Sequence, residues 1–204
     1  RTGHSGARTA MVASSLPAEG KPTTSLSLAR TYALSGVRTL LIDCDLRKPS
    51  IAGTLGLGPQ QGLLDYLLAP ADARPELRSI MALDSETDLE IIPSIGRSNR
   101  PTDQLLTSAA FAGIIEAVRQ HYDMIILDTP PVLPVVDARY LAGHAAAIAV
   151  VIKWAETRQQ DVRQTVSILD ESRQEGAPIF AVLNQQSGRR ARNYSQGYYG
   201  YGGG

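Results

Sequence analysis

Short apolar runs alternate along the chain with longer segments whose apolar residues recur every three or four positions. The runs are bounded by polar or turn-forming residues and have the length of buried strands in a parallel sheet. They lie at 10–13, 39–42, 89–92, 124–127, 148–152 and 178–183. The pattern therefore predicts strands in which both faces are covered by other parts of the protein.

The longer segments predict helices. One covers 21–35, with Gly36 as its C-cap, and another covers 101–120. A third begins at Thr157, which is spaced from Gln160 as in a capping box, and ends at Gly176. Strands that alternate with helices predict an α/β fold, a doubly wound and mostly parallel sheet flanked by helices.

The stretch 9–29 predicts a strand, a turn and a helix, with Gly20 and Lys21 at the helix start. Helix starts offer unpaired N–H groups and a positive dipole end, so they suit phosphate, to which Lys21 would add a charge. The match to G-x-x-x-x-G-K-[ST] is partial because Ser15 and Pro22 replace the first glycine and the last hydroxyl residue. A strand, turn and helix with a surface lysine is the alternative.

Acidic residues follow two of the predicted strands. Asp43 and Asp45 come after 39–42, and Asp128 ends the run 124–127. The carboxyl ends of parallel strands form the ligand edge of a sheet, and carboxylates there suit magnesium beside a phosphate loop. The alternative is a solvated turn in which Asp43 and Asp45 pair with basic neighbours. Asn184, after the last strand, is placed to contact a nucleotide base or is an ordinary turn residue.

Composition narrows these possibilities. The 204 residues include 20 Lys plus Arg and 20 Asp plus Glu, so no overall basic field favours nucleic acid. The single cysteine, Cys44, excludes an internal disulfide, fits a reducing compartment and is interpreted as a core residue. The longest apolar run, 145–152, is too short for a membrane span, and the first residues lack the apolar core of a secretion signal.

The last residues differ in character from the rest. We divide the chain into a nucleotide-binding domain, 1–188, and a flexible tail, 189–204, that cannot fold alone. Half of the eight tyrosines lie among the glycines of this tail, where they are placed to enter another molecule's active site. We call Tyr194, Tyr198, Tyr199 and Tyr201 the four tail tyrosines. The alternative is a low-complexity end without a role.

The motifs SSLPAEGK at 14–21, LLIDCDLRKP at 40–49, MIILDTPP at 124–131 and VLN at 182–184, with the tail, resemble one family. It is the cytoplasmic catalytic domain of bacterial tyrosine kinases of the polysaccharide co-polymerase type, which are P-loop NTPases of the deviant Walker superfamily. The resemblance implies autophosphorylation with ATP and Mg²⁺ that controls capsule or exopolysaccharide synthesis and export. It also implies a place at the inner face of the bacterial plasma membrane, a ring of copies, and a membrane co-polymerase segment, fused or separate.

Site residues follow from the same resemblance. Lys21, Asp43 and Asp45 match the catalytic positions, with Asp43 as the candidate base. Asp45, Asp128 and Asp43 match the magnesium positions, with Asp128 acting through water. The matching ATP-binding positions are Pro17, Glu19, Gly20, Lys21, Thr23 and Asn184. The four tail tyrosines are the implied phosphoacceptors.

The sequence departs from the family at three points. Pro22 stands where a magnesium-binding Ser or Thr is expected, so a hydroxyl and an N–H are both missing. The assembly signature E-x-x-R-x-x-R is not in this sequence, and Ala146 stands near an expected acid. A catalytically weakened, kinase-like regulator is therefore one alternative. Others are a partitioning or septum-site ATPase, whose signature lysine would fall at Leu16, and a scaffold that binds export machinery through the tail.

Overall fold

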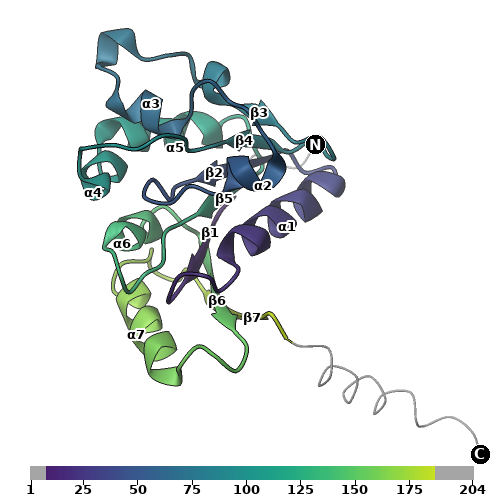
Figure 1. The fold of residues 1–204 in the computed structure, drawn as a ribbon, viewed down its shortest axis with the longest axis vertical. Coiled ribbons are helices and arrows are strands. Elements are labelled where there is room, and N and C mark those ends of the chain that lie inside the picture. Colours follow the sequence, from purple (N-terminus) through teal and green to yellow (C-terminus); the bar gives the residue numbers. More distant parts are fainter. Residues whose placement is uncertain (1–7, 187–204) are drawn as a thin grey trace, which may run out of the picture.

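One sheet runs through the centre of residues 8–186, which are the residues that this computed structural model describes (Figure 1). Its strands are β1 (Arg8–Ser14), β2 (Thr39–Asp43), β3 (Ala82–Leu83), β4 (Glu90–Ile92), β5 (Met124–Asp128), β6 (Ala147–Lys153) and β7 (Ile179–Asn184). Their order across the sheet is β3-β4-β2-β5-β1-β6-β7, and every neighbouring pair is parallel except β3 with β4. The mostly parallel sheet is thus confirmed, whereas the antiparallel edge strand was not predicted.

Helices cover both faces of this sheet. In the described part of the chain, the α-helices are α1 (Lys21–Leu34), α2 (Ile51–Leu55), α3 (Leu63–Leu68), α4 (Thr102–Leu106), α5 (Ala109–Arg119), α6 (Asp137–Ala142) and α7 (Gln159–Asp170), and the 3-10 helices are η1 (Ala71–Ala73) and η2 (Leu77–Ile80). Because side chains alternate along a strand, Val12 packs under α1 and Met11 packs on the opposite face. Each face of the sheet has its own hydrophobic core. Residues of α1 and α2 pack in the core that contains Val12, and residues of α3 to α7 pack in the core that contains Met11, which confirms the doubly wound architecture.

The order of the strands determines where a ligand can bind. β1 lies between β5 and β6. After β1 the chain builds the half of the sheet that contains β2, β4 and β5, and then it crosses to β6 and β7 on the other side. Ligands of open parallel sheets bind at the carboxyl ends of the strands where the winding changes direction in this way. The turn between β1 and α1 lies at that place (Figure 1).

Two of the predicted helices differ from the structure. The segment 101–120 is divided into α4 and α5, because the Ser108 hydroxyl accepts a hydrogen bond from the Phe111 N–H at 3.3 Å and caps a new helix. The helix after β6 begins at Gln159, and within residues 8–186 no side chain caps its start. The capping box proposed for Thr157 is therefore wrong, since that hydroxyl makes other contacts that are described below.

Glycines mark helix ends less regularly than the sequence indicates. Gly36 follows the C-cap of α1 with φ +78°, as expected for a left-handed residue after a helix. Gly176 also has φ +78°, but α7 has already ended at Asp170. The position of Gly176 therefore does not mark the helix end.

Two further predictions concern membranes and the tail. None of the helices between residues 8 and 186 is long and apolar enough to cross a membrane. The division at residue 188 and the four tail tyrosines lie outside the described residues, so both stay predictions.

Candidate active site

A tight loop joins β1 to α1, and we call residues 14–21 the phosphate loop. Its glycine, Gly20, has φ +88°, a conformation that other residues rarely adopt. A Cβ atom at Gly20 would also lie 2.0 Å from Asn184 Nδ2. Asn184 donates this amide to the Glu19 carbonyl at 2.9 Å, so the end of β7 supports the loop. Only glycine meets both conditions at this position.

Lys21 is the first residue of α1, and its side chain is buried. Its Nζ lies 3.0 Å from Asp128 Oδ1 at the end of β5. The Ser25 hydroxyl, one turn further along α1, donates to the same oxygen at 2.7 Å. The lysine, the serine and the acid therefore form one buried cluster beneath the phosphate loop.

The second oxygen of Asp128, Oδ2, is buried and has no hydrogen-bond partner within residues 8–186. Burial raises the pKa of this carboxyl, while the Lys21 charge and the Ser25 hydrogen bond act in the opposite direction. A buried oxygen without a partner is costly in a native protein. Asp128 is thus prepared to accept a further hydrogen bond or a cation.

Asp43 is the register partner of Asp128 on the neighbouring strand. Its Oδ1 accepts from Asp45 N at 3.2 Å, and its Oδ2 accepts from Ser50 N and Ile51 N, both at 3.1 Å. Burial, followed by the charge of Asp128, raises the pKa of Asp43 to about 7 although the backbone donors oppose the shift. Asp43 therefore shapes the loop after β2 and titrates near neutral pH.

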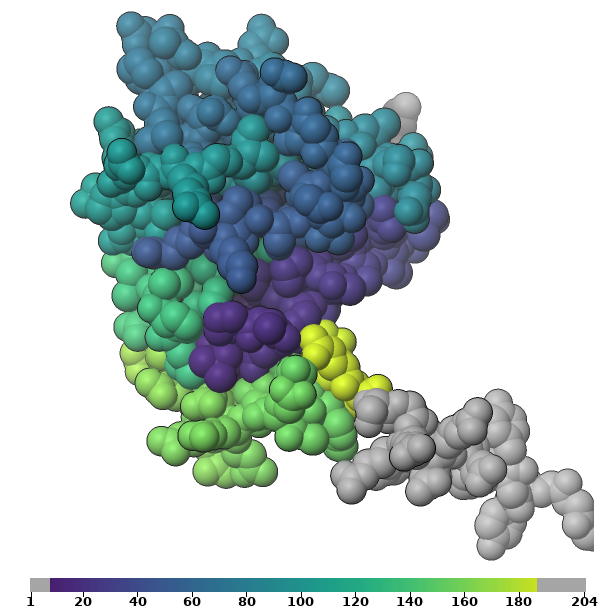
Figure 2. Space-filling view, in the orientation of Figure 1, coloured from purple at the N-terminus to yellow at the C-terminus, as the bar shows by residue number. Residues whose placement is uncertain are grey.

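Asp45 has different surroundings from Asp43. Its Oδ1 accepts from Lys48 N at 3.0 Å, and its side chain lines a cavity of about 470 Å³. Pro17, Glu19, Gly20 and Lys21 line the same cavity, which brings four of the predicted ATP-binding residues to one place. In the space-filling view, the purple atoms that follow β1 reach the surface between the blue chain after β2 and the yellow end of β7 (Figure 2).

Other predicted residues lie outside this cavity wall. Thr23 is exposed in the first turn of α1, and Asn184 points its amide at the loop backbone. Asp43 and Asp128 are fully buried at the adjacent strand ends. The cavity therefore has Asp45 in its wall, whereas the other two acids are not among its lining residues.

The three acids do not form a ready-made chelating group. Across the part of the chain that the structure describes, no three His, Cys, Asp or Glu side chains come together as a metal-binding set. Magnesium keeps several waters and needs only one or two carboxylates beside phosphate oxygens, so the donor set fits such a partial site. The unpartnered oxygen of Asp128 supports this fit. Direct coordination of magnesium by Asp43 is disfavoured because both of its oxygens accept backbone N–H groups.

Cys44, between the two acids of β2 and its loop, is fully buried. Burial, followed by the nearby charge of Asp43, holds the pKa of its thiol well above the usual range. A thiol that stays protonated is not a nucleophile. The interpretation of Cys44 as a core residue is therefore confirmed.

Sequence reasoning missed two residues that organise the site. Ser25 was not identified, although its position four residues after Lys21 places both on one helix face. Asp137, at the start of α6, is buried and its Oδ2 accepts from Arg47 Nε at 3.0 Å. That ion pair connects the loop after β2 to α6, and no signal in the sequence identifies the pairing.

Several proteins resemble this chain over most of its length. The sequence profile of a family described as AAA domain matches residues 13–178. Tyrosine-protein kinase CpsD of Streptococcus agalactiae is 34% identical over 185 residues, which cover 90% of this chain and 77% of CpsD. The matched residues include the whole phosphate loop and all three acids of the site.

Two relatives are much longer than this chain. Succinoglycan biosynthesis transport protein ExoP of Rhizobium meliloti is 36% identical over 158 residues, which cover 76% of this chain and 20% of ExoP. Tyrosine-protein kinase wzc of Salmonella typhimurium is 31% identical over 186 residues, which cover 91% of this chain and 25% of wzc. The chain thus spans a quarter or less of each of these two proteins.

Solved structures also resemble this chain in fold. The kinase domain of VpsO superposes with a TM-score of 0.79 at 34% identity, covering 89% of this chain and 86% of that one. The cell division ATPase MinD of Pyrococcus furiosus has a TM-score of 0.69 at 18% identity and covers 93% of this chain and 79% of that one. At that identity the second likeness concerns the fold alone.

Proposed function

Because the chain belongs to the bacterial tyrosine kinase family of capsule and exopolysaccharide synthesis, we propose that it is an ATP-dependent protein-tyrosine autokinase. The observation that carries this proposal is the buried cluster of Lys21, Ser25 and Asp128 beneath the phosphate loop. It places a positive charge and an acid with an unpartnered oxygen at a helix start. Anionic phosphates are stabilised at such a place.

ATP is proposed to occupy the cavity beside the phosphate loop, whose volume of about 470 Å³ is within the usual range for small-molecule sites. Pro17, Glu19, Gly20 and Lys21 would surround its phosphates. Lys21 exchanges its contact with Asp128 for the outer phosphates, where its charge stabilises the transferring group. The predicted contacts of Thr23 with phosphate and of Asn184 with the base belong to the same proposal.

Mg²⁺ would be held by Asp45, which lines the cavity, and by Asp128 through its unpartnered oxygen. When bound, the ion neutralises charge on the phosphates during transfer. Asp43 is kept as a candidate for the same site, with its effect on the ion carried by charge because its own oxygens accept N–H groups. Pro22 supplies no hydroxyl to the ion.

Asp43 is the proposed base. With a pKa of about 7, its carboxylate is matched to proton abstraction near neutral pH. The tyrosine hydroxyl transfers its proton to Asp43 as its oxygen bonds to the γ-phosphorus, the bond from that phosphorus to the bridging oxygen breaks, and ADP leaves. Because Ser50 and Ile51 donate to Asp43, their loop must shift for the tyrosine to reach it.

The test combines a nucleotide titration with a phosphotyrosine blot of the purified chain incubated with ATP and Mg²⁺. We expect binding and tyrosine phosphorylation in the native chain. Lys21→Met should lose both, because the outer phosphates lose their cation. A chain that binds ATP and never gains phosphotyrosine would overturn the kinase proposal and leave the ATP site standing.

A second candidate is a nucleotide-binding regulator without effective phosphotransfer. Pro22 favours it, since proline provides neither an N–H to phosphate nor a hydroxyl to the metal. In this case the phosphotyrosine blot would stay negative even though ATP binds and alters the conformation of the protein. Restoring the hydroxyl with Pro22→Thr should then produce phosphotyrosine.

Two other candidates have weaker support. A septum-site type ATPase would need a lysine where Leu16 stands, and leucine offers no charge. A scaffold would bind export machinery through the tail and need no nucleotide. ATP hydrolysis without phosphotyrosine would indicate the septum-site type ATPase, and failure to bind ATP would indicate the scaffold.

We infer the cellular setting from the same family. The protein is proposed to work on the cytoplasmic side of the bacterial plasma membrane, with a membrane co-polymerase segment that is fused or separate. Other copies of the chain are proposed as its partners, and nucleic acid is not. Size measurements with and without the membrane segment test the assembly, because a monomer under both conditions would contradict it.

A further inference from the structure

Both carboxylate oxygens of Glu19 accept hydrogen bonds from within the protein. The residue is only 3% exposed, and its Oε2 accepts from the Leu16 N–H of its own loop at 3.0 Å. Its Oε1 accepts from the hydroxyl of Thr157, which lies in the segment between β6 and α7. The carboxylate therefore joins two loops that are far apart in the sequence.

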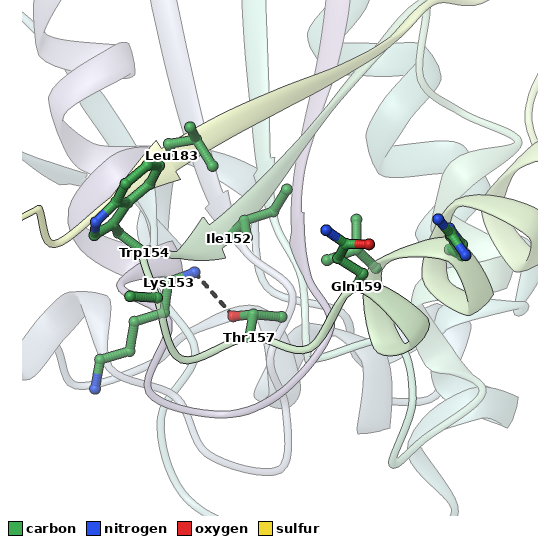
Figure 3. Close-up of a pocket in the computed structure, with 9 residues that line it drawn as sticks. Ile152, Lys153, Trp154, Thr157, Gln159 and Leu183 are labelled. Atoms are coloured by element: carbon green, nitrogen blue, oxygen red, sulfur yellow. Dashed lines mark hydrogen bonds between the residues drawn. The ribbon is translucent and has the colours of Figure 1, made fainter.

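Thr157 is itself held in place. Its Oγ1 accepts from the Lys153 N–H at 3.0 Å, at the end of β6 (Figure 3). A continuous series of hydrogen bonds thus runs from the amide of Leu16 through Glu19 and Thr157 to the amide of Lys153. We call this series the latch. It connects the phosphate loop to the carboxyl end of β6.

The far side of the latch borders a second cavity, of about 540 Å³. Thr157 is part of its wall, and so are Trp154 and Leu183, which lie together at one end of the pocket in Figure 3. Trp154 is the only tryptophan in the chain and is 36% exposed. A change in this loop should therefore alter the intrinsic fluorescence of the protein.

A carboxylate in a phosphate loop presents a physical problem, because its charge would repel the phosphates that the loop is meant to hold. Hydrogen bonds from an N–H and an O–H stabilise the charge and fix its direction. The latch therefore stabilises the charge of Glu19 at a fixed position, and its bond to Leu16 N–H also holds the backbone of residues 16–19. From the other side, Asn184 and Gln185 donate to the carbonyls of Glu19 and Ala18.

We propose that Glu19 and Thr157 are positioning residues that hold the phosphate loop in its binding form and couple it to the segment that carries Trp154. Neither residue touches the reacting atoms. Phosphate binding tightens the loop, and the latch transmits this to residues 154–158 and to the wall of the second cavity. The coupling part rests on the ATP site proposed above, whereas the holding part does not.

The first measurement needs no nucleotide. Amide hydrogen exchange is followed in the native chain, in Thr157→Val, which has nearly the same shape without a hydroxyl, and in the matched control Thr157→Ser, which keeps it. We expect exchange in residues 14–20 to be at least about tenfold faster in the valine variant, which corresponds to about 1.4 kcal/mol, and unchanged in the serine variant. Equal exchange rates in all three chains would overturn the proposal that the latch holds the phosphate loop.

The second measurement titrates Mg²⁺ and ATP while Trp154 fluorescence is recorded. We expect a signal in the native chain and in Thr157→Ser, and in Thr157→Val no signal and about tenfold weaker affinity measured by calorimetry. A valine variant with native affinity and signal would overturn the coupling. So would a serine variant as defective as valine, because side-chain volume would then be the cause.

The two measurements separate this inference from the proposed function. If no variant binds ATP while exchange responds as expected, the ATP site fails and the holding role of the latch stands. Thermal unfolding of both variants is the control for folding. The comparison with Thr157→Ser separates loss of the hydroxyl from any general loss of stability caused by substitution at this position. Glu19→Gln provides a second route, because it removes the charge that both donors stabilise and should also accelerate exchange in residues 14–20.

Discussion

Replacing Pro22 with threonine returns two groups to the start of α1. Pro22 is the second residue of this helix, where backbone N–H groups have no partner within the helix. Proline suits the position sterically because its fixed φ fits a first helical turn. The substitution therefore leaves the fold intact and adds an N–H and a hydroxyl beside the proposed phosphates.

The neighbouring hydroxyls do not compensate for the proline. The Thr24 hydroxyl donates to the Gly20 carbonyl at 3.0 Å, and the Ser25 hydroxyl donates to Asp128 at 2.7 Å. Thr23 is exposed in the same turn of the helix. A local shift that would bring Thr23 to the metal must therefore reorganise the start of α1.

The magnitude follows from the missing groups. A hydrogen bond to a charged partner contributes about 1.5 to 3 kcal/mol. At about 1.4 kcal/mol per tenfold, the affinity of Pro22→Thr for magnesium and ATP should exceed that of the native chain at least tenfold. Its thermal stability should fall slightly, since losing proline frees the unfolded chain by about 0.4 to 1 kcal/mol.

Calorimetric titration of ATP with and without Mg²⁺ measures this effect, and Pro22→Ala is the matched control. Alanine restores the N–H alone, so it should recover the part of the affinity that does not depend on magnesium. Threonine should recover both parts and increase tyrosine phosphorylation. Equal affinities and equal phosphotransfer in all three chains would show that Pro22 is harmless and refute this account of the loop.

Asp128→Asn should chiefly weaken magnesium-dependent ATP binding, which titrations with and without the ion measure; equal losses under both conditions would contradict the metal role. The pKa of Asp43 rises from 3.8 to about 7 on folding, so the native state holds this proton more tightly than the unfolded state. The free energy of unfolding should therefore fall as the pH is raised from about 4 to 7. Asp43→Asn should remove this fall in urea unfolding, and it should lose phosphotransfer with modest loss of ATP binding; an unaltered pH slope would refute the buried titration. Changing the four tail tyrosines to phenylalanine should abolish autophosphorylation while ATP still binds, and an unchanged phosphotyrosine blot would disprove their role.

The central strands could be predicted because their sequence pattern is simple. β2 and β5 are buried at every position, so each reads as an uninterrupted apolar run closed by an acid. β3 could not be predicted, since its two residues, Ala82–Leu83, are too short for a period and pair only through the tertiary fold. The break at Ser108 was hidden because apolar residues continue on both sides of it.

The placement of the candidate site residues was predictable where it depends on strand ends and not where it depends on side-chain partners. Gly20, Lys21 and the acids were identified from position alone, and the structure brings them to one edge of the sheet. The contact between Glu19 and Thr157 joins residues 138 positions apart, and nothing in either segment indicates the other. Such pairs become visible only when packing is known.

The same distances have a consequence for how the protein folds. The phosphate loop follows the first strand, yet its partners Asp128, Thr157 and Asn184 come 107, 138 and 165 residues after the loop residues they contact. Contacts between residues so far apart in the sequence form slowly, because the entropy cost of closing the long intervening chain comes before any stabilisation. During synthesis the phosphate loop is therefore completed long after β1 is made, and the capacity to hold phosphate should appear only when β7 joins the sheet and Asn184 contacts the loop.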